Sequence, residues 1–258
     1  MFYTFLQVLG GTGFTFFMTI LGAAVVFFFR GAIGDRMNRA FLGFASGVMM
    51  AASVWSLLIP SIEQSREQGM LPWLPPAAGF AAGGVFLYLV DKILPWFHAD
   101  YRGRKAGTKM LVLAVTVHNI PEGMAVGLGF VLAGQHIGEP GYLAAAIGLA
   151  VGIGIQNFPE GAAISLPVRQ SGSSALKSFF TGCISGIVEP VAGILVFFTA
   201  SAAARLMPWL LAFAAGAMIY VVADELIPQA QPDEASNMGT IGVMAGFLIM
   251  MILDVALG

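Results

Sequence analysis

The stretch Val117–Gly127, VHNIPEGMAVG, places a glutamate directly after a proline inside a long apolar run. A second stretch, IQNFPEGAAIS at Ile155–Ser165, repeats this pattern, so Glu122 and Glu160 occupy equivalent positions. A charge at the centre of a bilayer costs roughly 2.5–3.5 kcal/mol on insertion scales, and a proline removes a hydrogen bond from a helix. A doubled motif with both features therefore indicates a functional site.

The composition around these motifs is that of a membrane protein. The chain has 258 residues, of which 58% are hydrophobic and 10% are charged, whereas soluble domains carry about 25% charged residues. The net charge of −2 gives no reason to expect a nucleic-acid partner. The single cysteine, Cys183, lies in an apolar run, which excludes a disulfide framework and a thiolate metal cluster.

Eight apolar segments are long enough to cross a bilayer, which takes about 20 residues each. We predict an all-α polytopic membrane protein, a single transmembrane domain over residues 1–258. Its spans are expected at 2–29, 39–62, 72–95, 109–133, 142–167, 175–203, 208–229 and 238–257. Polar stretches separate these spans, and the sequence ARLMP at 204–208 is expected to break the sixth from the seventh. The first run is too long for a cleaved signal sequence and is interpreted as a retained helix.

Positive charge is distributed unevenly between the loops. Ten of the twelve Lys and Arg residues follow odd-numbered spans, and only Arg66 and Arg205 follow even-numbered ones. Because loops rich in Lys and Arg stay in the cytoplasm, the odd loops should be cytoplasmic. Both termini of an eight-span protein then lie on the extracytoplasmic side of the plasma membrane, which in a bacterium is the inner membrane.

The chain also repeats itself on a larger scale. FASGVM at 44–49 in the second span resembles FAAGAM at 213–218 in the seventh, and each is followed by Leu-Ile-Pro. The second and seventh spans run in opposite directions, as do the fourth and fifth. This pattern predicts a 3+2+3 inverted-repeat arrangement, a design in which transporters place a site near the midplane.

Helix geometry brings polar groups together within each motif. Residues three and four apart share a face of a helix. Each glutamate therefore shares one face with the residue four positions before it and an adjacent face with the residue three positions before it. The residues concerned are His118, Asn119 and Glu122 in the first motif, and Gln156, Asn157 and Glu160 in the second. Antiparallel packing of the two spans would bring the glutamates together as bridges between two metal positions.

A third acid strengthens the case for a divalent metal. Glu189 lies deep in the sixth span, beside Pro190, and bound cations would offset the cost of burying three acids. The donor set of one imidazole, oxygens and no thiolate suits Zn, Fe, Mn or Co better than Cu(I). Gly123 and Gly161, which follow the glutamates, permit close helix approach.

Simpler interpretations remain open for some of these residues. Asn119 or Asn157 alone could be interhelical glue, and Met49 alone is typical of core packing. Two other functions also fit parts of the pattern. An intramembrane metallohydrolase could use His118, Glu122 and Glu160 around one metal, and a proton-coupled transporter of small organic substrates could use the acids. Against the hydrolase, the chain has only three histidines. Against the transporter of organic substrates, the spans lack basic residues that could hold a substrate carboxylate.

The paired motifs HNIPEG and QNFPEG resemble the signatures of the ZIP (Zrt-, Irt-like protein) divalent metal transporters, most closely a bacterial type with Gln opening the second motif. The resemblance covers the whole chain and implies an importer of divalent metal into the cytoplasm, not an enzyme. Zinc is the favoured cargo, with Cd²⁺, Fe²⁺, Mn²⁺ and Co²⁺ as alternatives. The lipid bilayer is its environment, and the resemblance admits a homodimer.

The resemblance also assigns roles within a binuclear centre between spans four, five and six. The first position would use His118, Glu122, Gln156 and Glu160, with Met49 nearby, and the second Asn119, Glu122, Asn157, Glu160 and Glu189. Asp224 and Glu225, in DELIP, would be acids of the inner exit. Two departures matter: many members have His in place of Gln156, and the loop after the third span holds only His98 instead of a histidine-rich run.

Overall fold

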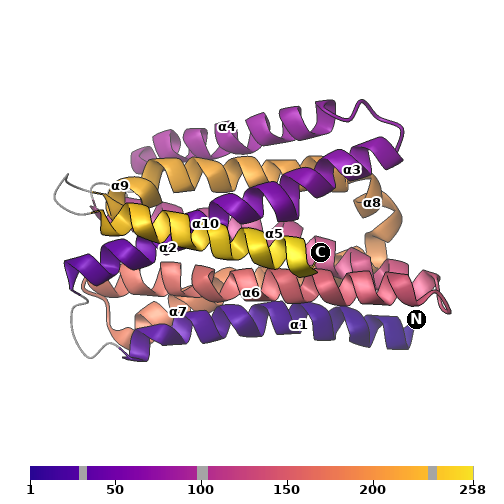
Figure 1. The fold of residues 1–258 in the computed structure, drawn as a ribbon, viewed down its shortest axis with the longest axis horizontal. Helices are drawn as coiled ribbons and strands as arrows, with labels where there is room; N and C mark the ends of the chain where they lie inside the picture. The colour runs from indigo at the N-terminus through magenta and orange to yellow at the C-terminus, as the bar shows by residue number, and fades with distance from the viewer. Residues whose placement is uncertain (29–33, 98–103, 232–236, 258) are drawn as a thin grey trace.

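A computed structural model describes residues 1–28, 34–97, 104–231 and 237–257, and every regular element in these ranges is a helix. The elements, drawn in Figure 1, are α1 (Phe2–Ala24), η1 (Val25–Phe28), α2 (Asp35–Ala52), η2 (Ser53–Leu58), α3 (Ile59–Glu67), α4 (Leu74–Phe97), α5 (Arg104–Gln135), α6 (Pro140–Gln170), α7 (Ala175–Gly186), α8 (Val188–Val221), η3 (Val222–Leu226), α9 (Ile227–Ala230) and α10 (Met238–Leu257). His98 lies outside the described residues.

The eight predicted spans are confirmed. Eight helical stretches in the described part of the chain are long and apolar enough to cross a membrane, and each overlaps one predicted segment. Several run past the predicted boundaries; the second stretch, for example, extends over Arg36–Glu67. Apolarity locates a span, but helices continue into the polar interface because backbone hydrogen bonding does not depend on side-chain hydropathy. The inverted repeat itself stays a prediction.

The sixth and seventh spans are separate, as predicted, but the break between them lies a few residues before 204–208, since the two spans cover Ala175–Ala200 and Ala203–Ala230. Helix α8 continues through this segment, and its non-helical backbone lies earlier, at Thr199 (φ −122°, ψ 20°). Pro208 is accommodated inside the helix because its neighbours supply hydrogen bonds. The carbonyl of Ala204, which Pro208 cannot bond, accepts from Gln68 Nε2 at 2.8 Å, and Ser61 Oγ donates to the Pro208 carbonyl.

The two segments that resemble each other in sequence share an uncommon local structure. The π-helix η2 ends two residues before Pro60, and the π-helix η3 ends two residues before Pro228. A proline cannot donate to the carbonyl four residues earlier, and a wider turn is one way in which a helix absorbs this missing bond. The repeated Leu-Ile-Pro sequence therefore produces the same backbone irregularity twice.

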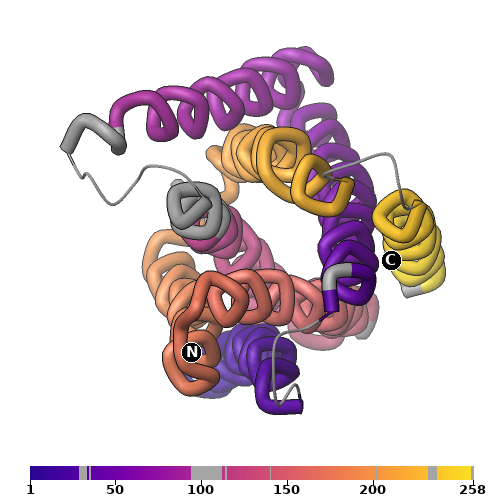
Figure 2. Tube along the Cα trace, turned by 90° about the vertical axis from the view of Figure 1, so that its left-hand side faces the viewer, coloured from indigo at the N-terminus to yellow at the C-terminus, as the bar shows by residue number. Residues whose placement is uncertain are grey.

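The helices pack in two groups: one contains α1, α5, α6, α7 and the beginning of α8, and the other contains α2, α3, α4, α10 and the later part of α8. The most extensive contacts join α2 to α10, α4 to α8, α5 to α8 and α1 to α6. Viewed from one end, α10 lies against α2 at one side, α4 lies beside α8 at another, and α1 lies beneath α6 (Figure 2). Helix α8 belongs to both groups, since its beginning packs on α5 and its later part packs on α4.

Glycines at the motifs allow the closest of these approaches. A Cβ atom on Gly123 would overlap the backbone of Glu189, and one on Gly161 would overlap the backbone at Thr19. Because each glycine directly follows a motif glutamate, the same close contact that joins the helices also places α8 and α1 next to that glutamate. The predicted role of both glycines in close helix packing is confirmed.

We expect Gly123→Ala to destabilise the bundle by about 1–3 kcal/mol, because the rigid backbone of α8 cannot move away from the new methyl group without strain. Gly129→Ala, on the same helix, is the matched control. Its Cβ would meet Ala146 at an ordinary 3.5 Å, so it should be neutral or stabilise by up to about 1 kcal/mol. Reversible unfolding in mixed detergent micelles measures both, and equal effects would contradict the packing argument.

Candidate metal centre

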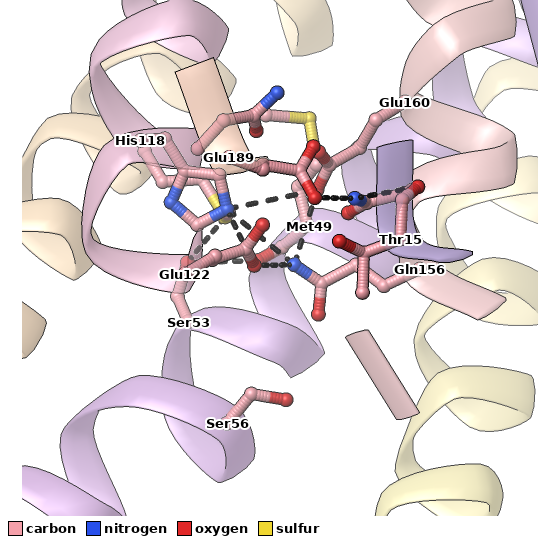
Figure 3. Close-up of polar contacts among 12 residues, drawn as sticks. Thr15, Met49, Ser53, Ser56, His118, Glu122, Gln156, Glu160 and Glu189 are labelled. Atoms are coloured by element: carbon pink, nitrogen blue, oxygen red, sulfur yellow. Dashed lines mark hydrogen bonds and ion pairs between the residues drawn. The ribbon is translucent and has the colours of Figure 1, made fainter. Parts of the chain in front are cut away.

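Three ionisable side chains from two helices converge inside the bundle. His118 and Glu122 come from α5 and Glu160 comes from α6. His118 Nε2 lies 3.0 Å from Glu122 Oε1 and 3.7 Å from Glu160 Oε1. Each residue offers one ligand atom, and the three atoms lie within 4.8 Å of one another, close enough to share a metal ion (Figure 3).

These side chains are sealed from solvent. His118 and Glu122 are 0% exposed and Glu160 is 1% exposed. In the described part of the chain, the ion-pair partner of both carboxylates is the imidazole of His118. A buried carboxylate is costly unless a cation or hydrogen bonds compensate it. The triad therefore provides a strong electrostatic attraction for a divalent cation.

The side chain of Gln156 lies against the three residues of the triad. Its Nε2 atom donates to Glu122 Oε1 and to Glu160 Oε1, the latter at 3.2 Å, and it lies 3.4 Å from His118 Nε2. Helix geometry on α5 and α6 predicted this grouping from the sequence. The structure brings all four side chains together, as Figure 3 shows.

A second group of polar side chains lies beside the triad. Asn157 Nδ2 donates to Glu189 Oε2 at 2.8 Å, and Asn119 Nδ2 donates to the carbonyl of Ser185 on α7 at 3.0 Å. Asn119, Asn157 and Glu189 are all 0% exposed. The predicted residues of the second position thus gather on α5, α6 and α8.

Helix α1 contributes to this second group, which the sequence analysis missed. Thr19 Oγ1 lies 3.4 Å from Glu189 Oε1, and the carbonyl of Thr15 accepts from Asn157 Nδ2 at 3.3 Å. Both threonines are buried, as is Thr12 one turn earlier. The signal was a row of threonines three and four residues apart on an otherwise apolar helix, a pattern that a single span does not distinguish from helix packing.

Buried oxygen atoms without hydrogen-bond partners surround both groups. In a buried site, an acceptor without a donor costs about 1–3 kcal/mol. Among the described residues, the orphaned side-chain oxygens here are Asn119 Oδ1, Glu122 Oε2, Gln156 Oε1, Asn157 Oδ1 and Glu160 Oε2. Five acceptors left over at one place fit the binding of cations, which supply the missing positive charge.

Met49 is buried, with 1% exposure, and Figure 3 draws it in the same close-up as the triad. It belongs to the core cluster that also holds Met218, its counterpart in the repeated sequence. The hydroxyl of Ser53 donates to the Met49 carbonyl at 2.7 Å and lies 2.9 Å from the Met218 sulfur. These contacts show packing at Met49, and its role as a ligand stays a prediction.

The two predicted exit acids lie away from the triad. Asp224 is exposed and Glu225 is half-buried in η3, at the end of the bundle near α9 (Figure 1). Glu225 Oε2 accepts from Gln229 Nε2 at 3.0 Å. Their exposure at one end of the bundle is compatible with an exit, which also stays a prediction.

Another acid was missed in the last span. Asp254 on α10 accepts a hydrogen bond from Ser56 of η2 at 2.7 Å, and its Oδ2 atom is buried without a partner in the described part of the chain. Its signal in the sequence was an acid within an apolar helix, close to the C-terminal end. The contact ties α10 to the π-helical segment that follows Met49.

Comparison with known proteins places the chain in a family. Residues 98–254, more than half of the chain, match the family described as ZIP zinc transporter. The chain belongs to the ZIP family. Similar proteins include zinc transporter ZIP11 of Xenopus tropicalis, which is 38% identical with 98% of each chain covered.

Bacterial members of the family are similar to a comparable degree. Zinc transporter GufA of Myxococcus xanthus is 38% identical over 84% of this chain and 86% of its own length. Zinc transporter ZIPB of Bordetella bronchiseptica is 35% identical over 97% and 81%. The family resemblance drawn from the paired motifs is therefore confirmed, and these relatives agree with a bacterial member.

Proposed function

We propose that this protein transports zinc across a membrane, using His118, Glu122 and Glu160 as the principal binding position. The observation that carries this proposal is the buried triad, whose three ligand atoms lie within 4.8 Å of one another. The zinc transporter names of its relatives support transport rather than hydrolysis. A carrier must also release its cargo, and two carboxylates, one imidazole and one amide form a site of moderate strength.

The donor chemistry supports zinc as the cargo. Zinc accepts imidazole nitrogen and carboxylate oxygen at four-coordinate sites, and Gln156 Oε1 could supply a fourth donor because it is free of hydrogen bonds in the described contacts. The same set accommodates Cd²⁺, Fe²⁺, Mn²⁺ and Co²⁺. Met49 would add a soft thioether beside the position and favour the softer of these ions.

We further propose that the site is binuclear, with Glu122 and Glu160 as bridges. Each glutamate directs one oxygen at His118 or Gln156 and leaves its second oxygen without a partner. Asn119, Asn157 and Glu189 would complete a second position made of oxygen donors alone. With three acids against two dications, the filled pair keeps a positive charge, so the second position should bind more weakly.

The direction of transport follows from the orientation of the protein in the membrane. Both termini lie toward the same end of the bundle (Figure 1), and the basic loops support placing that end outside a bacterial inner membrane. Entry from that side and exit past Asp224 and Glu225 would import metal into the cytoplasm. The two packed groups of helices would slide relative to each other to expose the site alternately, and a homodimer would hold one group fixed.

Metal uptake into proteoliposomes tests the proposed function. We expect Glu122→Ala and Glu160→Ala each to reduce zinc uptake to background, because either change removes a bridging carboxylate. Glu139→Ala is the matched control, since Glu139 is exposed in the connection between α5 and α6, and it should transport normally. Near-normal uptake by either bridge variant, with normal insertion, would contradict the proposal.

Asn157→Asp tests the second position. In the metal-free protein the new carboxylate would face Glu189 in place of the amide that now donates to it at 2.8 Å. A cation would relieve this repulsion, so the second zinc should bind at least about tenfold more tightly, since ligand charge tunes affinity. Calorimetry on the purified protein measures this, and unchanged stoichiometry and affinity would remove Asn157 from the site.

Two positions at opposite ends of α6 test the orientation. In a Cys183→Ser background, Ile137→Cys, just before α6, should react with an impermeant thiol reagent in intact cells. Gln170→Cys, the last residue of α6, should react only after permeabilisation, because the basic loops predict a cytoplasmic location. Both side chains are exposed, and the reverse labelling pattern would overturn the direction of transport.

A further inference from the structure

The amide of Gln156 lies where a metal ion would have to bind. Its Nε2 atom contacts Glu122 Oε1, Glu160 Oε1 at 3.2 Å and His118 Nε2 at 3.4 Å. Those residues are the three that could share one ion. An amide nitrogen in contact with all three leaves no room for a cation on the same atoms.

The orientation of this amide follows from its surroundings. Two carboxylate oxygens need donors, and the NH₂ group of glutamine has two N–H bonds to give. The opposite orientation would place the amide oxygen against the two carboxylate oxygens and remove a hydrogen-bond donor from each. Gln156 Oε1 instead points away and has no partner among the described residues.

This arrangement makes a simple exchange available. The last torsion of a glutamine side chain is broad and roughly two-fold, so a half-turn swaps Nε2 for Oε1 with little movement of other atoms. The half-turn breaks no bond to Oε1, because none is present in the described contacts. A metal ion arriving at the triad would take over the charge compensation that the NH₂ group provides.

We propose that Gln156 has two roles, as the occupant of the empty site and as an oxygen ligand of the loaded one, and that rotation of its amide accompanies each cycle of binding and release. The inference rests on the proposed transport site and adds a part for one residue within it. In the empty protein the amide stabilises two buried carboxylates without a metal. In the metal-loaded protein, rotation of the NH₂ group back toward the carboxylates competes with the metal and speeds its release.

The residue type matters for this double role. Neutral histidine has one N–H and therefore cannot donate to both carboxylates at once. An aspartate or glutamate at this place could not donate at all when ionised. Glutamine is long enough to reach the triad from α6 and carries both a double donor and an acceptor on one group, which only the amide side chains do.

Gln156→Met tests the proposal, because methionine has similar length and no N–H donor. Without metal, the variant should unfold at a lower temperature than wild type. Its zinc association rate should rise by at least about fivefold, because the arriving ion no longer has to displace a hydrogen bond of the Gln156 amide. Gln170→Met, on the same helix but exposed, is the control and should change neither property.

Other outcomes of this experiment decide against the proposal. If Gln156 were only a ligand, the metal-free stability would stay unchanged and association would be no faster. If it were only a packing residue, the metal-free and zinc-loaded forms would lose stability equally. Either result overturns the exchange of roles.

A second measurement uses the wild-type protein and does not depend on a variant that folds. With ¹³C-labelled glutamine side chains, the infrared difference spectrum between zinc-loaded and metal-free protein should show one amide carbonyl band moving to lower frequency. No shift would refute the exchange, while zinc uptake by the same preparation would leave the proposed function intact. A shift together with absent uptake would instead reject transport and keep the site.

Discussion

The structure depends on one electrostatic constraint, the burial of three carboxylates within an apolar helical bundle. Glu122, Glu160 and Glu189 are at most 1% exposed. Their described partners are one imidazole, amide groups and a threonine hydroxyl. Such a group of acids is stable only if every donor around it is well placed or a cation balances it. This requirement explains why polar residues cluster at one place in an otherwise hydrophobic chain.

Close helix packing is what makes that cluster compact. The motif glycines let the backbones of α8 and α1 approach within the space a side chain would occupy. Each close contact also places a polar residue at the site: Glu189 lies beside Gly123, and Thr19 lies beside Gly161. The Pro-Glu-Gly sequence thus combines a missing backbone hydrogen-bond donor, a charge and a contact surface in three consecutive residues. Its duplication on two neighbouring helices supplies both halves of the site.

The sequence predicted those features that depend on one helix at a time. The eight spans follow from apolar length, and the grouping of His118 with Glu122 follows from residues four apart sharing a face. The contact of Gln156 with both required only that α5 and α6 be neighbours. These expectations were confirmed because local geometry and composition leave little freedom within a membrane helix.

The features that sequence reasoning missed depend on contacts between distant segments. The hydroxyl and carbonyl groups of Thr19 and Thr15 reach the second position only because α1 packs there. The continuation of α8 through Pro208 relies on Gln68 and Ser61, which lie far away in the sequence. No periodicity within one span contains this information, so a proline next to a polar stretch looked like a helix end.

We propose that one imidazole and two bridging carboxylates hold the transported ion. X-ray absorption spectroscopy of the purified protein with one equivalent of zinc tests it most directly. We expect a shell of nitrogen and oxygen at about 2.0–2.2 Å, with the outer scattering of a single imidazole that disappears in His118→Ala. An imidazole signal that survives in His118→Ala, or a wild-type spectrum without an imidazole signal, would contradict this assignment.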